Sequence, residues 1–475
     1  MADFSQLNFV NVGPGGTFQP SGDVQTTPED VDAIFDHLRA TNAQKLVLYF
    51  HGGLVPESTG MATAEKMWGV FKDHAHPVTF VWETGFLETV GRNLKTISAT
   101  RLFQKIVKFA IREAVKRLGG DVTGRGPGQA PSDDEIQAEL DAAARFARYD
   151  AAARGAAGRI DEAELDAIQP DIEAALEVEL AADPELLDIA DAEVPNTPLV
   201  DESVVRGPAG KGVDLVSLAV TVGKIVIAVI RRYLKQRDHG FYPTVVEETL
   251  RAIYLADFGA WVWSGMRDGA QGMWQPNDGL SGEAQHAGAY FLAHLNGLIK
   301  ERPSLIVDLV GHSAGAIAIC HLLATASARH PDIKFRHIAF MAPACTAGLC
   351  HDEIVKHPER YVQFRMYAMR DDLESKDELV PRVYTRSLLY FISGVLESEP
   401  DSPLAGLERH SRGSTPYDSD VLSALHHFLR EEVPQRLVLS ETTGSQPGFN
   451  STAVTHGAFD DDKPTRESLA ALVAA

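Results

Sequence analysis

Continuous apolar runs alternate with helical patterns toward both ends of the chain. The runs that predict strands are KLVLYFHGG (45–53), PVTFVWE (77–83), SLIVDLVGHS (304–313), KFRHIAFMAPA (334–344), YVQFRMYAM (361–369) and QRLVLSE (435–441). Strands covered on both faces show such unbroken apolar runs, whereas half-exposed strands alternate. AGAIAICHLLATASARH and SDVLSALHHFLREEV have the composition and length of covering helices. The alternation predicts an α/β fold with a mostly parallel central sheet flanked by helices.

The interval from 86 to 275 has a different pattern. It opens with a helix-like stretch over 100–120, passes through the Gly/Pro-rich DVTGRGPGQAPSDD, and continues to about 194 in an Ala/Glu/Asp-rich region with high helix propensity. We therefore expect a large helical insertion, a cap or lid, over 86–275. The core would then consist of 1–85 and 276–475.

Two stretches of this insertion raise the question of membrane contact. A basic amphipathic helix is predicted over 101–118, and the stretch 212–235 is strongly apolar. However, Asp214 and Lys224 lie inside the second stretch, and the acidic region nearby offers the basic helix an internal partner. We favour packing within the insertion; contact with a membrane surface is the alternative that is not favoured.

Charge and cysteine content narrow the functional classes. The net charge of −22 argues against a nucleic-acid partner, because phosphates would be repelled over most of the surface. The three cysteines, Cys320, Cys345 and Cys350, form no disulfide framework and suit a reducing compartment. The first residues lack the basic and apolar regions of a signal peptide. We expect a cytoplasmic protein with no metal and no cofactor.

Candidate chemistry appears where the run at 304–313 meets a helix. The sequence Gly311-His-Ser313-Ala-Gly315 places one serine between two glycines at a strand-to-helix turn. Such a turn exposes the serine hydroxyl and requires small residues two positions away on either side. A hydroxyl becomes a nucleophile only with a base within hydrogen-bond reach, so Ser313 is the candidate nucleophile.

The same turn predicts part of an oxyanion site. The amides at the start of the helix, beginning with Ala314, point toward the serine and favour negative charge. A second donor is expected from the glycine pair that follows the run at 45–50, in YFHGGLV. We predict the amides of Gly53 and Ala314 as the oxyanion donors.

The base and its orienting acid are expected later in the chain. His456 follows the run at 435–441, in the polar loop NSTAVTHGAFDDD, and Gly457 gives that loop freedom. The orienting carboxylate is expected directly after the run at 361–369. Asp372 is the first choice there, with Asp371 and Asp377 as alternatives. His312, although adjacent to the serine, is expected to point away from the site.

With these residues identified, the chain resembles the α/β-hydrolase superfamily, in particular its lipase-like and esterase-like branches. The resemblance rests on YFHGGLV, FVWETGFLET, LVGHSAGA, FMAPAC, the acidic loop and THGAFD, and it covers roughly 45–90 and 275–460. It implies an α/β-hydrolase fold and a triad in the order Ser313, Asp372, His456. The insertion at 86–275 departs from the family pattern and matches no lid we know.

The predicted function is hydrolysis of carboxylic esters, including lipid or acyl substrates, through an acyl-enzyme. The partner is then a small-molecule ester; no protein partner is indicated. Two alternatives stay open: an amidase or acyltransferase with the same triad, and a hydrolase-fold scaffold whose charged insertion binds a protein or a membrane. Because a histidine base must be neutral, activity is expected to fall as the pH drops below its titration point.

Overall fold

The computed structural model describes most of the chain, in eleven stretches: 3–52, 57–82, 86–118, 128–142, 146–157, 161–183, 186, 200–201, 214–254, 260–432 and 435–475. The chain divides into two compact units. The first comprises Met1–Thr89, Val262–Asp377 and Pro403–Ala475, and the second comprises Val90–Trp261 and Glu378–Ser402. The second unit therefore contains most of the interval 86–275 and, in addition, a later segment, 378–402.

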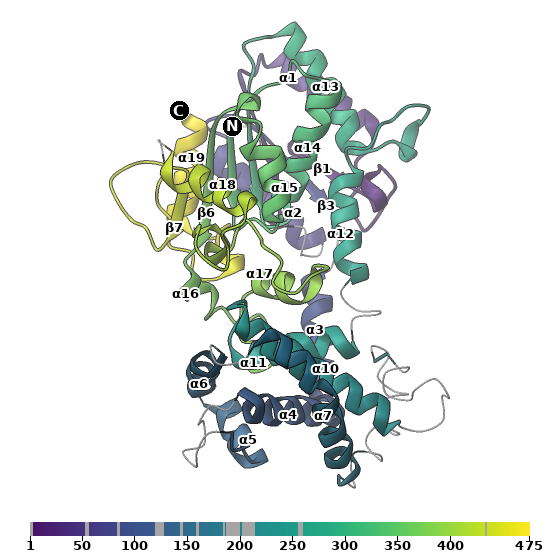
Figure 1. Cartoon of the computed structure of the whole chain (residues 1–475). Helices are drawn as coiled ribbons and strands as arrows, with labels where there is room; N and C mark the ends of the chain where they lie inside the picture. The colour runs from purple at the N-terminus through teal and green to yellow at the C-terminus, as the bar shows by residue number, and fades with distance from the viewer. Residues whose placement is uncertain are drawn as a thin grey trace. The chain divides into compact units, whose positions relative to one another are not determined.

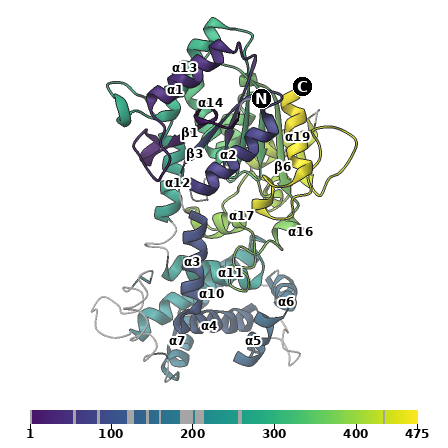
Figure 2. The same cartoon turned by 180° about the vertical axis from the view of Figure 1, so that it is seen from behind.

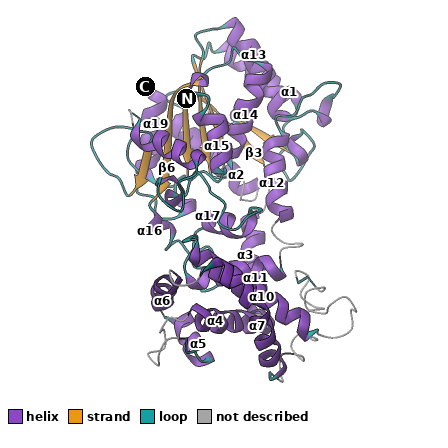
Figure 3. Cartoon of the chain, viewed as in Figure 1, coloured by secondary structure: helices purple, strands orange, loops and turns teal. Residues whose placement is uncertain are grey.

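The first unit is built on a seven-stranded sheet. Its strands are β1 (Phe9–Val12), β2 (Lys45–Phe50), β3 (His76–Trp82), β4 (Ile306–His312), β5 (Phe335–Met341), β6 (Tyr361–Met369) and β7 (Leu437–Ser440). Their order across the sheet is β1-β3-β2-β4-β5-β6-β7, and every pair is parallel. The carboxyl ends of all seven strands consequently lie at one edge. Figure 3 shows all the described strands, in orange, within this unit.

Six of these strands correspond to the predicted apolar runs, and the α/β class is confirmed. The run at 361–369 forms β6 over its whole length, β3 is shifted by one residue from the run at 77–83, and the other strands are shorter than their runs by one to three residues at an end. Strand β1 was not predicted from the sequence. It has only four residues, and it extends the sheet beyond β3 through long-range pairing from Phe9 to Thr79 and from Val12 to Trp82.

Helices cover both faces of the sheet. In Figure 1, α13 (Ala287–Glu301), α14 (Gly315–Arg329) and the short α15 (Ala347–Cys350) lie in front of it. The view from behind shows α2 (Glu57–Phe71) and α19 (Lys463–Ala474) on the other face (Figure 2). The unit also contains α1 (Pro28–Ala40), α12 (Ala260–Gly272), whose first two residues fall in the second unit, and the short α16 (Asp371–Glu374) and α18 (Asp420–His426). Central strand residues such as Leu48, Phe50 and Leu309 are fully buried, which explains the unbroken apolar runs.

The second unit is helical in the part that the structure describes. Its helices are α4 (Arg101–Leu118), α5 (Asp133–Asp141), α6 (Ala147–Ala157), α7 (Glu162–Ala181), α10 (Leu215–Leu234), α11 (Phe241–Ile253) and α17 (Leu388–Phe391), with most of α3 (Phe86–Ala99). Helix α10 packs against α4, α7 and α11. Of the two charged residues singled out in its sequence, Asp214 caps the helix and Lys224 is exposed.

The internal pairing expected for the basic helix is confirmed. Helix α4 buries Leu102, Ile106 and Phe109, and its cations contact acidic residues of the same unit. Lys105 Nζ lies 2.5 Å from Asp183, and Arg112 Nη1 lies 2.7 Å from Asp133. Among the helices that the structure describes, none combines the length and the apolar character that spanning a bilayer requires.

A buried charge cluster joins the later segment 378–402 to the helices of the second unit. Glu247 accepts hydrogen bonds from Arg232 Nη1 (2.5 Å) and Tyr384 Oη (2.5 Å), and its third contact is His239 Nδ1 (2.8 Å). The other ring nitrogen of His239 lies 2.8 Å from Asp401. Burial alone would raise the pKa of Glu247, but His239 and Arg232 lower it to about 2.

Candidate active site

Ser313 stands at a sharp turn between β4 and α14. The strand ends at His312, the helix begins at Gly315, and Ser313 has a φ of +51°, a conformation that side chains other than glycine rarely adopt. Backbone hydrogen bonds hold this strained residue. The Ser313 N–H donates to the carbonyl oxygen of Met341 at 2.8 Å, and the Ser313 carbonyl accepts from the N–H of Ala344 at 3.0 Å. Strain that is retained in this way is typical of functional sites.

The two glycines that flank the turn are required by close packing. A Cβ atom on Gly315 would lie 2.1 Å from the carbonyl oxygen of Phe50, at the end of the neighbouring strand β2. A Cβ atom on Gly311 would lie 2.9 Å from the carbonyl carbon of Gly315. Backbone atoms cannot yield as a flexible side chain can, so the small residues predicted on either side of Ser313 are a steric requirement.

His456 contacts the serine hydroxyl. Its Nε2 lies 2.9 Å from Ser313 Oγ, although 143 positions separate the two residues in the chain. The histidine begins a short 3-10 turn (His456–Ala458) in the loop that follows β7. Both side chains are buried, since Ser313 is 1% exposed and His456 is 6% exposed. The structure thus brings together the two residues that the sequence singled out.

The protonation of His456 is set by its surroundings. Burial and the nearby His312 lower its pKa to about 3, against the opposing effect of Asp460. The imidazole is therefore neutral at physiological pH, as a general base must be before it accepts a proton.

The structure does not bring the first-choice acid, Asp372, to the histidine. Its carboxylate binds Arg370 Nε at 3.0 Å, and its side chain is 54% exposed. Asp371 lies 3.5 Å from Arg412. The alternative Asp377 is the predicted acid that reaches His456: its Oδ2 accepts the backbone N–H of the histidine at 2.8 Å. Burial raises the pKa of Asp377 above its ordinary value.

Asp377 binds the backbone of His456 and not the ring. The Nδ1 atom of His456 is buried and has no hydrogen-bond partner among the described residues. The histidine is held instead through its main chain, with its N–H on Asp377. The sequence alone could not separate the three aspartates, because all of them follow β6 within eight positions of its last residue.

The predicted oxyanion donors are described only in part. Gly53 lies outside the described residues. The Ala314 N–H follows the serine directly, and it donates to no carbonyl or side chain of the described part of the chain. Gly52 lies beside the turn: a Cβ atom added there would be 3.5 Å from Ser313 Cβ. The strand-to-loop junction after β2 therefore reaches the serine, as the glycine pair predicts.

Sequence reasoning was wrong about His312 and missed Asp460. The expectation was that His312 points away from the site. Instead its Nε2 lies 3.1 Å from the carbonyl oxygen of His456, and its Nδ1 lies 2.9 Å from Asp460 Oδ2. The rings of His312 and His456 are 5.4 Å apart. Asp460 could have been suspected from the sequence, because it lies four positions after His456 in THGAFD, in the same loop.

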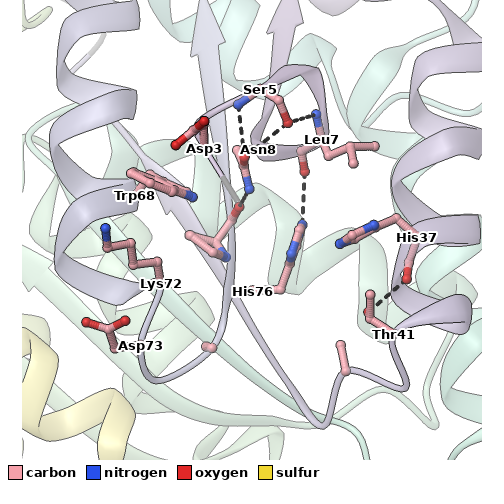
Figure 4. Close-up of a pocket in the computed structure, with 13 residues that line it drawn as sticks. Asp3, Ser5, Leu7, Asn8, His37, Thr41, Trp68, Lys72, Asp73 and His76 are labelled. Carbon is pink, nitrogen blue, oxygen red and sulfur yellow. Dashed lines mark hydrogen bonds between the residues drawn. The ribbon is translucent and has the colours of Figure 1, made fainter. Parts of the chain in front are cut away.

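A separate pocket lies at the opposite edge of the sheet. Its volume is about 340 Å³, and His37, Trp68, Lys72 and His76 are among its lining residues (Figure 4). His76 is the first residue of β3, so this pocket is at the amino ends of the parallel strands. Ser313 follows the carboxyl end of β4, which excludes this pocket as the place where a substrate would meet the serine.

Among the described residues, no group of three or more His, Cys, Asp or Glu side chains is placed to hold a metal ion. No family model, no curated protein and no solved structure matches this chain. The site contains a strained serine in contact with a neutral histidine, next to a helix-start amide that has no hydrogen-bond partner among the described residues. That combination is suited to nucleophilic attack with proton transfer.

Proposed function

We propose that the protein is a serine hydrolase of the α/β-hydrolase type that cleaves carboxylic esters through an acyl-enzyme. The observation that carries this proposal is the 2.9 Å contact between Ser313 Oγ and His456 Nε2, at a strand-to-helix turn with a positive φ. A buried serine in a strained backbone, paired with an imidazole from a distant loop, has little structural purpose. A nucleophile and its base require both features.

The acylation step follows from these positions. Ser313 Oγ attacks the carbonyl carbon of the ester, and its proton passes to His456 Nε2. The carbonyl oxygen becomes an oxyanion, and the Ala314 N–H is the described donor that would receive it; such a donor contributes about 3 kcal/mol of transition-state stabilisation. The C–O bond to the alcohol then breaks, and His456 returns the proton to the departing oxygen.

Deacylation repeats the sequence with water. The water oxygen attacks the acyl carbon while His456 accepts the water proton. The bond to Ser313 Oγ breaks, the proton passes to the serine oxygen, and the carboxylic acid leaves. Each cycle restores the serine hydroxyl and the neutral imidazole, so no co-reactant besides water is consumed.

We assign the acid position of the proposed triad to Asp377 in place of Asp372. The support is that Asp377 accepts the backbone N–H of His456 at 2.8 Å, whereas Asp372 pairs with Arg370 near solvent. A negative charge close to the histidine favours the imidazolium that forms when the serine proton is transferred.

The proposal is tested by hydrolysis of short p-nitrophenyl esters by the purified full chain. We expect turnover that falls by at least about a thousandfold in Ser313→Ala and His456→Ala, because a triad acts as a unit. Ser327→Ala, in the same helix α14, is the matched control and should retain wild-type turnover. Wild-type turnover in Ser313→Ala would refute the assignment. Absence of turnover in the wild type on esters of every chain length would refute the reaction class.

A further inference from the structure

Two adjacent residues of the serine turn each contact the histidine loop. Ser313 binds the ring of His456, and His312 binds both the carbonyl of His456 and the carboxylate of Asp460. The serine turn and the loop are therefore joined at two neighbouring points. The contacts of His312 are not needed to bring a base to a nucleophile. They must therefore have another role.

The partners of His312 determine its protonation. Its Nδ1 faces Asp460 Oδ2 at 2.9 Å, and its Nε2 faces a backbone carbonyl oxygen at 3.1 Å. A carbonyl oxygen and an ionised carboxylate only accept hydrogen bonds, so each ring nitrogen must donate. A histidine that donates from both nitrogens is an imidazolium. His312 thus pairs as a buried cation with a carboxylate anion.

The charged groups around this pair favour that assignment. Asp460 also accepts a hydrogen bond from Tyr49 Oη on β2, at 2.6 Å. Lys66 of α2 acts on Asp460 through space and forms an ion pair with Asp461. His51 at the end of β2 has its pKa lowered to about 4, mainly by burial, and is neutral.

Opposing effects act on the pair itself. Burial alone would lower the pKa of His312, but Asp460 and the His456 carbonyl raise it above the ordinary value. Burial alone would raise the pKa of Asp460, but His312 and Tyr49 lower it.

We infer that His312 and Asp460 are positioning residues for His456: together they hold the backbone and the charge state of the base. This inference rests on the proposed function and extends it to the residues that control the base. The main chain of His456 is held at both sides, its N–H by Asp377 and its carbonyl by His312. Because Nδ1 has no partner in the part of the chain that the structure describes, these two main-chain contacts fix where the ring can reach Ser313 Oγ.

The arrangement also explains how the base stays neutral. The His312 imidazolium lies beside the His456 ring, with ring centres 5.4 Å apart, and a second positive charge at that distance is unfavourable. His456 therefore resists protonation by solvent. The Asp460 carboxylate offsets this repulsion when the serine proton arrives.

The test compares His312→Gln and His312→Leu with the wild-type full chain in ester hydrolysis. Gln keeps one donor for the His456 carbonyl but has no charge, whereas Leu has neither a donor nor a charge. We expect kcat to fall about 10- to 100-fold, more in Leu than in Gln, with KM changed by less than about threefold, because a small misplacement of a catalytic group has this effect. Asp460→Asn should show a similar loss. The double variant His312→Gln/Asp460→Asn should lose little more than either single variant.

The pH profile separates positioning from a general structural role. Loss of the His312 charge removes a repulsion, so the acid limb of kcat/KM should move to higher pH in His312→Gln. His76→Gln is the matched control: His76 Nε2 also contacts a backbone carbonyl, that of Leu7 at 2.9 Å, but at the other edge of the sheet. That variant should retain the wild-type profile. An acid limb unmoved in His312→Gln would overturn the inference.

Two further measurements keep the outcomes distinct. Nitrogen NMR of the wild type, with labelled histidine, should show His312 protonated at both nitrogens at neutral pH; a single protonated nitrogen overturns the inference even if the variants fail to fold. Labelling of wild-type Ser313 by a fluorophosphonate tests the proposed function separately. Labelled wild type with unchanged His312 variants would overturn this inference alone. Unlabelled wild type would overturn the proposed function.

Discussion

The proposed base, His456, is a buried neutral imidazole. Its burial and the neighbouring His312 lower the pKa of His456 to about 3, far from the ordinary histidine value. The side chain therefore stays ready to accept a proton over a wide pH range. This changes the pH dependence that a histidine base was expected to give from sequence alone.

Activity is predicted to be constant through mild acid. The base must be neutral, and His456 stays neutral until the pH approaches its lowered pKa, so the acid limb of kcat/KM should lie below about pH 5. The measurement is kcat/KM on an uncharged ester in the pH range where circular dichroism shows the chain folded. A limb near the ordinary histidine value would contradict the described environment of His456.

Replacing the two aspartates is predicted to have unequal effects. Asp377→Ala removes the acceptor of the His456 N–H and the nearest predicted acid, so kcat should fall by at least about a hundredfold. Asp372→Ala removes an exposed side chain paired with Arg370 and should change kcat by less than about twofold. Ester kinetics of the two variants decide the matter; equal losses, or the reverse order, would contradict the choice of Asp377.

At the scale of single residues, the serine and the histidine could be predicted because each has a local signature. Ser313 sits between obligatory glycines, and His456 lies in the polar loop after the last strand. The acid could not be selected, since Asp371, Asp372 and Asp377 share one short stretch and only tertiary contacts distinguish them. The second role of the loop, through Asp460 and His312, depends on long-range contacts that no local pattern encodes.

At the scale of elements, the strand-to-helix turn is the feature that positions Ser313, the proposed nucleophile. Packing against the end of β2 fixes this turn. Gly315, the first residue of α14, lies against the carbonyl oxygen of Phe50, the last residue of β2. Five of the six predicted strands have six to nine residues, and the sixth, β7, has four. The missed strand, β1, has four residues and is defined by pairing with β3 and not by its own pattern.

Alanine at two glycines should have opposite effects on stability. Gly315→Ala places a Cβ atom against the carbonyl of Phe50 and should lower the free energy of unfolding by about 1–3 kcal/mol, as overpacking does. Gly297→Ala, inside α13, meets no atom within 4 Å and should raise it by about 0.5–1 kcal/mol through helix propensity. Urea unfolding measures both. A stable Gly315→Ala variant with wild-type turnover would contradict the steric account of the turn.

At the scale of the whole molecule, the chain contributes two separated segments to its second unit. The sequence pattern predicted one insertion over 86–275, and the compact unit contains 90–261 together with 378–402. The later segment could not be assigned from its sequence, because it is short. Its place depends on buried contacts with residues far earlier in the chain, such as Tyr384 with Glu247 and Asp401 with His239.

The buried charge cluster is predicted to be a major source of stability for this unit. Glu247→Gln leaves the buried Arg232 and His239 without their shared carboxylate and should lower the free energy of unfolding by about 3–5 kcal/mol. Glu162→Gln is the matched control, since Glu162 pairs with Arg231 and Lys235 on the same helix but is 50% exposed. Its cost should be below about 1 kcal/mol. Equal losses in urea unfolding would contradict the assigned burial.

The most direct test of the central claim is to locate the covalent adduct of a fluorophosphonate probe by mass spectrometry of the digested wild-type chain. We expect one modified residue, Ser313, with labelling lost in Ser313→Ala and strongly slowed in His456→Ala. An adduct at any other serine, or labelling that persists in Ser313→Ala, would contradict it.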